Sequence, residues 1–274
     1  METRLRRLIR PLVRRTISLI EPVVGFRTDP TGHLLLRVKM IFGRYEPFLF
    51  REICRALPTN GTFADIGANV GFFSQQIARR FPRARVVAFE PNPRIYPLLH
   101  RNLSAFSNGR AFQMGLGARE GVLGFFHGEE SCVGSFVQEY TSQHPSNSLR
   151  GQIKKCEVTV ATGDAMLADA GTIDVIKMDV EGYESQVLKG MSHLLHQRAI
   201  KTIFFEFCPF AQKCAGSQPE EIVHLLINSG YVIAEMEGQN EGALVSAENV
   251  RALVTRLGGR GYTTLRADLR PGRN

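Results

Sequence analysis

A short stretch between residues 62 and 80 constrains the fold more than any other part of the sequence. The apolar run Thr62-Phe63-Ala64 leads into Asp65, and a loop of small residues with two glycines follows. Residues 73–80 then have the composition of a helix. A strand, a glycine loop and a helix in this order allow backbone N–H groups to approach a ligand closely. The stretch therefore predicts a ligand-binding turn in an α/β fold.

A further acidic residue follows this loop at an informative distance. The apolar run 86–89 ends in Glu90, which lies 19 residues after Gly71. In nucleotide-binding α/β folds, a carboxylate about 20 residues after the glycine loop stands at the tip of the second strand and binds the ribose hydroxyls. We therefore expect Glu90 to hold a ribose diol.

The loop differs from two common nucleotide-binding patterns. Its spacing is Gly-x-x-x-Gly, without the third glycine of the dinucleotide pattern and without the Lys-Ser or Lys-Thr pair of a phosphate-binding loop. Asp65 instead suits a ligand with a cationic head, and S-adenosylmethionine is such a ligand. The alternative is a tight turn whose glycines serve the backbone alone. Asp65, Gly67, Gly71 and Glu90 taken together favour the cofactor site.

Strand and helix signals alternate from residue 62 onward, which predicts a doubly wound, mostly parallel sheet. We expect seven strands, the last of them at 263–269 and inserted antiparallel, with a further inserted strand at 122–127. The polar stretch 131–151 lacks periodicity and is long for a connection, so it is either a lid over the substrate or a solvated insertion. We expect residues 44–274 to form this domain and residues 1–43 to form a separate extension.

The extension begins with a basic, amphipathic segment. Apolar residues recur at helical spacing between arginines in residues 1–20, and Pro11 predicts a break into two short helices. Apolar alternation in residues 22–43 predicts a small hairpin. We favour packing of the first segment on its own domain or on a second subunit, and contact with an anionic membrane surface is the alternative.

The charge distribution argues against a nucleic-acid partner. The net charge is +8, but residues 1–20 and 251–274 each carry six arginines and one acidic residue, so the segment between them has a formal charge of −2. A nucleic-acid enzyme usually concentrates basic residues around its active site. No apolar run approaches ~18 residues, and the five cysteines form no Cys-x-x-Cys pair. We expect reduced thiols and a cytoplasmic protein, with membrane association through residues 1–20 as a further option.

Acidic residues stand where the relevant strands are expected to end, and ligands of open α/β sheets bind outside those ends. These residues are Asp65, Glu90, Asp179 and Glu206. Each alone could be a helix cap or a solvated turn residue. Together they predict an acidic crevice that suits an adenosyl sulfonium and a divalent cation.

The segment Asp179-Val180-Glu181-Gly182 carries two carboxylates on the same side of an extended chain. Such a carboxylate can orient a cofactor, accept a proton from a hydroxyl group or bind Mg²⁺. Asp179 is our first candidate for the general base, and Glu181 and Glu206 follow it. Asp179 is also the candidate metal ligand. The alternative for Glu181 is that it begins the next helix and interacts with the helix dipole.

Several segments resemble the FkbM family of S-adenosylmethionine-dependent methyltransferases. They occur in the family's order and spacing across residues 43–235, and they are Tyr45-Glu46, Asp65-Ile66-Gly67-Ala68-Asn69-Val70-Gly71, Phe89-Glu90-Pro91-Asn92, Ile176-Lys177-Met178-Asp179-Val180-Glu181-Gly182-Tyr183-Glu184 and Val187-Leu188-Lys189-Gly190.

The resemblance implies a class I methyltransferase fold (Rossmann-like) and O-methylation of a sugar, glycan or other natural-product hydroxyl. It further implies that Asp179 faces the methyl group and Glu90 holds the ribose of S-adenosylmethionine. The residues expected to contact the cofactor are Asp65, Gly67, Ala68, Asn69, Gly71, Glu90, Asn92 and Asp179. The arginine-rich ends match no motif of the family, so the acceptor is left open.

Two other functions are considered. Lys177, Asp179, Lys189 and Glu206 supply the residue types of the Lys-Asp-Lys-Glu arrangement of 2′-O RNA methyltransferases, although Lys177 lies inside an apolar strand. The second is a non-catalytic adenosyl-binding or membrane-surface scaffold built on residues 1–20.

Overall fold

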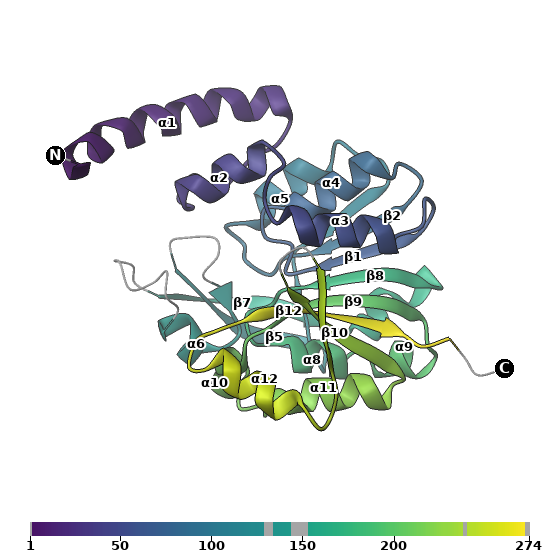
Figure 1. The fold of residues 1–274 in the computed structure, drawn as a ribbon. Helices are drawn as coiled ribbons and strands as arrows, with labels where there is room; N and C mark the ends of the chain where they lie inside the picture. The colour runs from purple at the N-terminus through teal and green to yellow at the C-terminus, as the bar shows by residue number, and fades with distance from the viewer. Residues whose placement is uncertain (1, 129–133, 144–152, 238–239, 272–274) are drawn as a thin grey trace.

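A large twisted sheet forms the centre of the computed structural model, which describes residues 2–128, 134–143, 153–237 and 240–271 (Figure 1). Its eight strands lie in the order β11-β10-β12-β9-β8-β1-β2-β3. Their bounds are β1 (Thr62–Ile66), β2 (Arg85–Phe89), β3 (Gly109–Phe112), β8 (Ile173–Met178), β9 (Ile200–Phe207), β10 (Tyr231–Glu237), β11 (Asn240–Val245) and β12 (Thr263–Leu269).

The sheet is parallel at its centre and antiparallel at one edge. Strands β3, β2, β1, β8 and β9 pair in parallel, whereas β12 pairs antiparallel with both β9 and β10. The antiparallel insertion at 263–269 is confirmed, and so is the doubly wound class I fold. The sheet has one strand more than expected, because residues 240–245 pair with β10 as a hairpin.

Helices cover both faces of the sheet (Figure 1). One face carries α3 (Pro47–Ala56), α4 (Phe72–Arg80) and α5 (Tyr96–Leu103). The other carries α8 (Glu184–Lys189), α9 (Ser192–His196) and α11 (Pro219–Asn228), and α10 (Pro209–Cys214) and α12 (Val250–Leu257) lie beside them.

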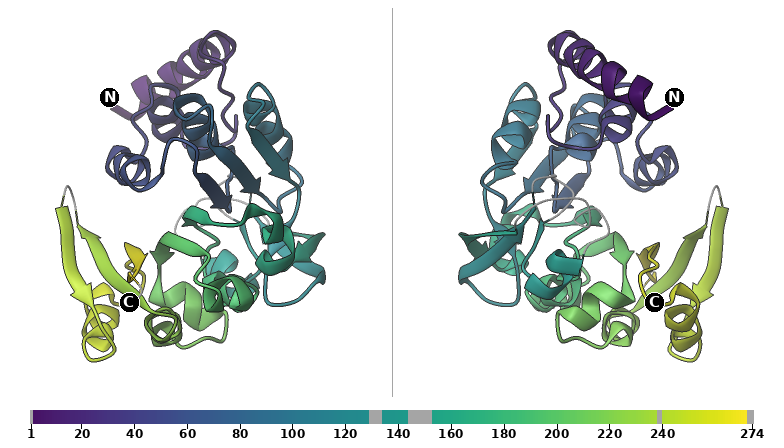
Figure 2. Two further views of the ribbon diagram at one scale, coloured as in Figure 1. Left: turned by 90° about the vertical axis from the view of Figure 1, so that its right-hand side faces the viewer. Right: turned by 90° about the vertical axis from the view of Figure 1, so that its left-hand side faces the viewer.

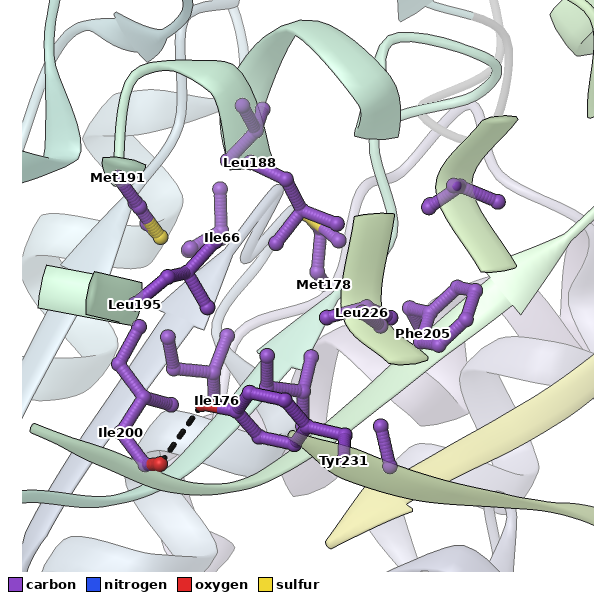
Figure 3. Close-up of a cluster of buried hydrophobic side chains, with 14 of the residues drawn as sticks. Ile66, Ile176, Met178, Leu188, Met191, Leu195, Ile200, Phe205, Leu226 and Tyr231 are labelled. Atoms are coloured by element: carbon purple, nitrogen blue, oxygen red, sulfur yellow. Dashed lines mark hydrogen bonds between the residues drawn. The ribbon is translucent and has the colours of Figure 1, made fainter. Parts of the chain in front are cut away.

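Successive residues of the central strands serve two different cores. Phe63 of β1 and Val175 of β8 pack in the cluster under α3–α5, while Ile66 and Ile176 pack in the cluster under α8, α9 and α11. Figure 3 shows the second cluster, in which the Tyr231 hydroxyl donates a 2.8 Å hydrogen bond to the carbonyl of Ile200. This two-sided burial explains the continuous apolar runs of the sequence, since both faces of a parallel sheet exclude water.

The chain changes direction beside β1. It winds from β1 through α4 and β2 to β3, and it later returns to place β8 on the other side of β1. The carboxyl ends of β1 and β8 therefore flank the topological switch point, where open α/β sheets bind their ligands. The glycine loop follows β1, and Asp179 follows β8.

A second sheet is inserted between β3 and β8. It has the order β4-β7-β5-β6, with β4 (Gly115–Leu116), β5 (Gly121–His127), β6 (Gly134–Ser135) and β7 (Lys154–Ala161). The expected inserted strand at 122–127 is confirmed as β5. Helix α6 (Gln138–Gln143) follows β6, and the short helix α7 (Gly163–Met166) follows β7. The rest of the stretch 131–151 lies outside the described residues.

The first 43 residues differ from the expectation in two respects. Helix α1 (Glu2–Val24) passes through Pro11 without a break, and residues Leu34–Ile41 form helix α2 rather than a hairpin. The strand prediction rested on the alternation of apolar and polar residues. It was wrong because the segment is rich in Leu, Lys and Met, which are strong helix formers. The helix also places Arg37 in the protein interior, where its Nη2 lies 3.2 Å from Oε1 of Glu21.

Helix α1 is the element farthest from the sheet in the views of Figures 1 and 2. Its residues Leu19 and Val23 are 75% and 85% exposed. Within the described residues, no helix is long and apolar enough to span a bilayer.

Candidate active site

A cavity of about 410 Å³ opens at the switch point. It is lined by residues from segments that are distant in the sequence, namely 28–46, 66–73, 89–92, 114–116, residue 125, 134–140, 177–181, 206–210 and 260–262. Residues 28–40 of the extension thus form part of its wall. The division of the chain at residue 43 stays a prediction.

The glycine loop fits tightly against the segment that follows β8. Gly67 has a φ of 76°, and a Cβ atom at this position would lie 1.9 Å from the backbone oxygen of Asp179. The Asp179 N–H in turn donates a 3.0 Å hydrogen bond to the carbonyl of Ile66. Only glycine accommodates both the positive φ and this contact, so Gly67 brings the two strand ends together at the cavity.

Glu90 connects the glycine loop to the end of β2. Its Oε2 accepts a 2.8 Å hydrogen bond from the N–H of Asn69, and its Oε1 accepts one of 2.8 Å from the N–H of Asn92. Burial raises the pKa of Glu90 to about 7, although both N–H groups favour the ionised form. The carboxylate lines the cavity together with Gly67, Ala68, Asn69 and Asn92. These five predicted cofactor contacts therefore share one wall.

Asp65 and Gly71 lie behind that wall and do not line the cavity. Asp65 is 1% exposed, and its Oδ2 accepts hydrogen bonds from the N–H and the hydroxyl of Ser74, at 3.2 and 2.6 Å. The carboxylate thereby satisfies donors in the first turn of α4. Asp65 thus stabilises the turn between β1 and α4 through its hydrogen bonds to Ser74.

Lys177 belongs to the site, although the sequence suggested a role for it only in the RNA methyltransferase alternative. Its Nζ lies 3.2 Å from Oδ2 of Asp179 and 3.8 Å from Oδ1 of Asp65, and 5.5 Å from the centre of the Phe73 ring. Burial alone would lower the pKa of Lys177, but Asp179, Asp65 and Glu46 outweigh it and raise the pKa. The usable signal was the i, i+2 spacing of Lys177 and Asp179, which puts both side chains on one side of a strand.

Glu181 is held by the inserted segment. The Tyr140 hydroxyl donates a 2.7 Å hydrogen bond to its Oε2, and the Ser135 hydroxyl donates one of 2.8 Å to its backbone oxygen. Its backbone adopts a φ of 54°, which is uncommon for a residue other than glycine. Burial and then the nearby charge of Asp179 raise the pKa of Glu181 to about 8. Strained backbone of this kind is often found at functional sites.

Two further carboxylates face the same space. Glu206, near the end of β9, lines the cavity, and its pKa is raised well above the usual value by burial and then by Asp179 and Glu181. Glu46 also lines the cavity, with its pKa raised mainly by burial, and the Tyr45 hydroxyl donates a hydrogen bond to it. The floor of the cavity thus gathers four carboxylates, those of Glu46, Asp179, Glu181 and Glu206, around one ammonium.

The Lys-Asp-Lys-Glu arrangement is not assembled. Lys177, Asp179 and Glu206 line the cavity, but Lys189 lies on α8, where its ammonium is 3.9 Å from a carboxylate oxygen of Glu221. In the described part of the chain, no three His, Cys, Asp or Glu side chains are grouped so that they could hold a metal ion. Metal binding by Asp179 stays a prediction.

The inserted segment and the C-terminal part contribute residues that sequence reasoning did not single out. They are Phe136, Tyr140, Phe210, Arg260 and Tyr262, and all of them line the cavity. The sequence gives little indication that these residues line a cavity, because isolated aromatic residues are more often part of a hydrophobic core. Part of the expected substrate loop, residues 134–140, does reach the cavity.

The fold and the site define a class I S-adenosylmethionine-dependent methyltransferase. The residues present suit the cofactor, because the Gly67 loop lies at the switch point and the buried Glu90 carboxylate lies at the tip of β2. Residues 65–233 match the family described as the Methyltransferase FkbM domain, and the chain belongs to this family.

Several characterised proteins are similar to the chain. Methyltransferase sdnD from Sordaria araneosa is 30% identical over 218 residues, which cover 68% of this chain and 82% of that protein. Hexuronic acid methyltransferase AglP from Haloferax volcanii is 28% identical, covering 67% and 68%. 2-O-methyltransferase NoeI from Sinorhizobium fredii is 29% identical over 46% of this chain and 55% of its own length.

Proposed function

We propose that this methyltransferase transfers the methyl group to a hydroxyl oxygen of a sugar, glycan or other natural product. The observation that carries the proposal is the floor of carboxylates in the same cavity as the glycine loop. Carboxylates accept hydrogen bonds from hydroxyl groups and can take up the proton that a hydroxyl loses.

The chain's own residues suggest how the cofactor is held. Glu90 would bind the ribose hydroxyls, and the backbone of residues 67–70 would support the methionine end. S-adenosylmethionine supplies a methyl group that is already activated by the sulfonium. Positioning of the acceptor oxygen by the protein therefore supplies much of the acceleration.

A base is still needed, because a neutral alcohol is a poor nucleophile. The sequence ranks Asp179 first, but its charge faces the Lys177 ammonium at 3.2 Å. No ion pair joins Glu181 to a cation among the described residues, and its carboxylate accepts a hydrogen bond from Tyr140. We therefore assign proton uptake to Glu181 and the orientation of the site to the Lys177–Asp179 pair. Glu206 is the remaining candidate.

The relatives support the chemistry of the proposal. One of them is named as a 2-O-methyltransferase and another as a hexuronic acid methyltransferase. The first name states methylation of an oxygen, and the second states a sugar acid as the acceptor.

Methyl transfer from labelled S-adenosylmethionine to pools of sugars, lipid-linked glycans, macrolides and RNA tests the proposal. We expect label in a sugar-containing or natural-product pool, and Glu181→Gln should abolish most of it. The surface variant Glu139→Gln, in the same inserted segment, is the control. Label confined to RNA would support the 2′-O alternative, and cofactor binding with no transfer to any pool would support the scaffold.

Two expectations about partners stay as predictions. The exposed apolar residues of α1 and its arginines suit an anionic membrane surface. A second copy of the chain could cover the same helix.

A further inference from the structure

Arg260 lines the cavity but has no role in the proposed methyl transfer. Of the Arg and Lys side chains that line it in the described residues, Arg37 pairs with Glu21 and Lys177 pairs with Asp179. Arg260 also lines the cavity, but no carboxylate of the described residues pairs with it. A guanidinium without a carboxylate partner, beside a site for a small molecule, suits an anionic group of the ligand.

The turn that carries Arg260 is shaped to present it. Gly258 ends α12 with a φ of 61°, and the Gly261 N–H donates a 3.0 Å hydrogen bond back to the carbonyl of Leu257. A Cβ atom at Gly261 would lie 2.2 Å from that carbonyl oxygen. The turn therefore requires glycine at positions 258 and 261, and it brings Arg260 and Tyr262 together to the cavity wall.

An aromatic surface joins Arg260 to the carboxylates. The guanidinium carbon lies 5.5 Å from the centre of the Phe210 ring, whose centre is 6.1 Å from that of Tyr140. Tyr140 in turn donates its hydrogen bond to Glu181. A guanidinium in a cation–π contact with an aromatic ring still has N–H groups available to bind an oxyanion.

The two ends of this wall have opposite charges. Tyr140 contacts Glu181 and Phe210 contacts Arg260, so a ligand that lies along these two rings can place a hydroxyl group at the carboxylate and an anion at the guanidinium. The hydroxyl groups would face the carboxylates, and the anion would face Arg260. The aromatic rings between them offer a surface on which the apolar face of a sugar ring can pack.

We propose that the acceptor is a sugar bearing an anionic group, a carboxylate or a phosphate, and that Arg260 binds this group while a hydroxyl of the same molecule faces Glu181. The proposal rests on the proposed sugar O-methylation and adds the charge of the acceptor and its orientation. In this orientation the anionic group lies at Arg260 and a hydroxyl group lies at Glu181. The methyl group is therefore transferred to the hydroxyl oxygen and not to an oxygen of the anionic group.

Binding is measured first, independently of turnover. Ligand-observed NMR titrations of the full chain with S-adenosylhomocysteine would use glucuronic acid, glucose 6-phosphate and glucose as probes. We expect the anionic sugars to bind at least about tenfold tighter than glucose, as for a charge-assisted hydrogen bond. Comparison of the two anionic probes distinguishes carboxylate from phosphate recognition.

Variants assign the preference to Arg260. Arg260→Gln should reduce the affinity for the anionic probes to that for glucose and leave cofactor affinity unchanged, and Arg260→Lys should restore part of the difference. Arg251→Gln removes an exposed arginine that does not line the cavity, so it should have no effect. Equal binding of glucose and both anionic sugars, or a preference that persists in Arg260→Gln, would overturn the proposal.

Turnover separates this inference from the proposed function. Methylation of neutral sugars at the same kcat/KM as their anionic counterparts would retain O-methylation and refute the role of Arg260. A product whose methyl group is released by mild alkali, as from an ester, would refute both the orientation and O-methylation of a hydroxyl. An alkali-stable methyl ether on an anionic sugar, lost in kcat/KM by Arg260→Gln, is the expected result.

Discussion

The Lys177 ammonium lies 3.2 Å from Oδ2 of Asp179, two residues farther along the chain. Because side chains of a strand alternate between its faces, residues 177 and 179 point to the same side, toward α4 and the glycine loop. The pair places a buried positive charge directly under the cavity. The Lys177 side chain is 8% exposed and that of Asp179 is 35% exposed, so a change at Asp179 leaves the buried ammonium with less counter-charge.

The first prediction concerns this pair. Asp179→Asn should lower the free energy of unfolding by about 1–3 kcal/mol, since it weakens the counter-charge of a buried ammonium that keeps Asp65 nearby. Lys177→Met combined with Asp179→Asn should cost less than the sum of the two single losses, because both single variants remove the same ion pair; the remaining cost reflects Asp65, which loses its ammonium. Urea unfolding of the wild type, both single variants and the double variant measures this cycle. Additive losses in the double variant would contradict the coupling.

The second prediction concerns the pH dependence of catalysis. A base must be ionised to accept a proton, so kcat/KM should rise with pH through the pKa of Glu181, which burial raises to about 8. Glu181→Gln should remove this rise and reduce turnover by ~10²–10⁴-fold. Asp179→Asn should be slower than wild type but keep the rise. The opposite pattern, with the rise lost only in Asp179→Asn, would return the role of base to Asp179.

The third prediction concerns the cofactor site. Glu90→Ala should weaken S-adenosylhomocysteine binding by ~1.5–3 kcal/mol, the contribution of hydrogen bonds to a charged group. Gly67→Val should weaken binding further, because its Cβ would collide with the backbone oxygen of Asp179. Gly259→Ala, where no atom lies within 4 Å of the added Cβ, is the control. Unchanged calorimetric affinity in both site variants would refute the site assignment.

The fourth prediction concerns metal ions. The proposed proton transfer to Glu181 requires no metal, and Asp179 is engaged by Lys177, so EDTA should leave turnover unchanged. Inhibition by EDTA that Mg²⁺ reverses would show instead that a carboxylate of the site binds the metal. Activity assays of the metal-stripped enzyme, with and without added Mg²⁺, provide the measurement.

The fifth prediction concerns helix α1. Removal of residues 1–20 retains Glu21 and its contact with Arg37, so cofactor affinity should be unchanged. Co-sedimentation of both forms with vesicles rich in anionic lipid tests contact with a membrane, since the deleted segment carries six arginines. Size-exclusion chromatography of both forms tests the alternative that α1 joins two copies. A folded, shortened chain that no longer binds the cofactor would contradict this prediction.

Local sequence determined the core of this protein. The apolar runs of β1, β2 and β8 predicted a buried parallel sheet, since such strands have no polar face. The Gly67 turn and Glu90 were recognisable because backbone geometry restricts which residues can stand there. Segments where local preference and tertiary packing agree, such as residues 62–90, are the ones that sequence reasoning predicts well.

Tertiary structure decided the rest. Residues 34–41 alternate like a strand, but packing on α1 and the burial of Arg37 against Glu21 make them a helix. The sequence predicts that Asp65 contacts the cofactor, but in the fold its carboxylate accepts a hydrogen bond from Ser74. The meeting of Arg260, Phe210 and Tyr140 depends on elements far apart in the chain. No local pattern encodes such contacts, because they arise only when the sheet brings its strand ends together.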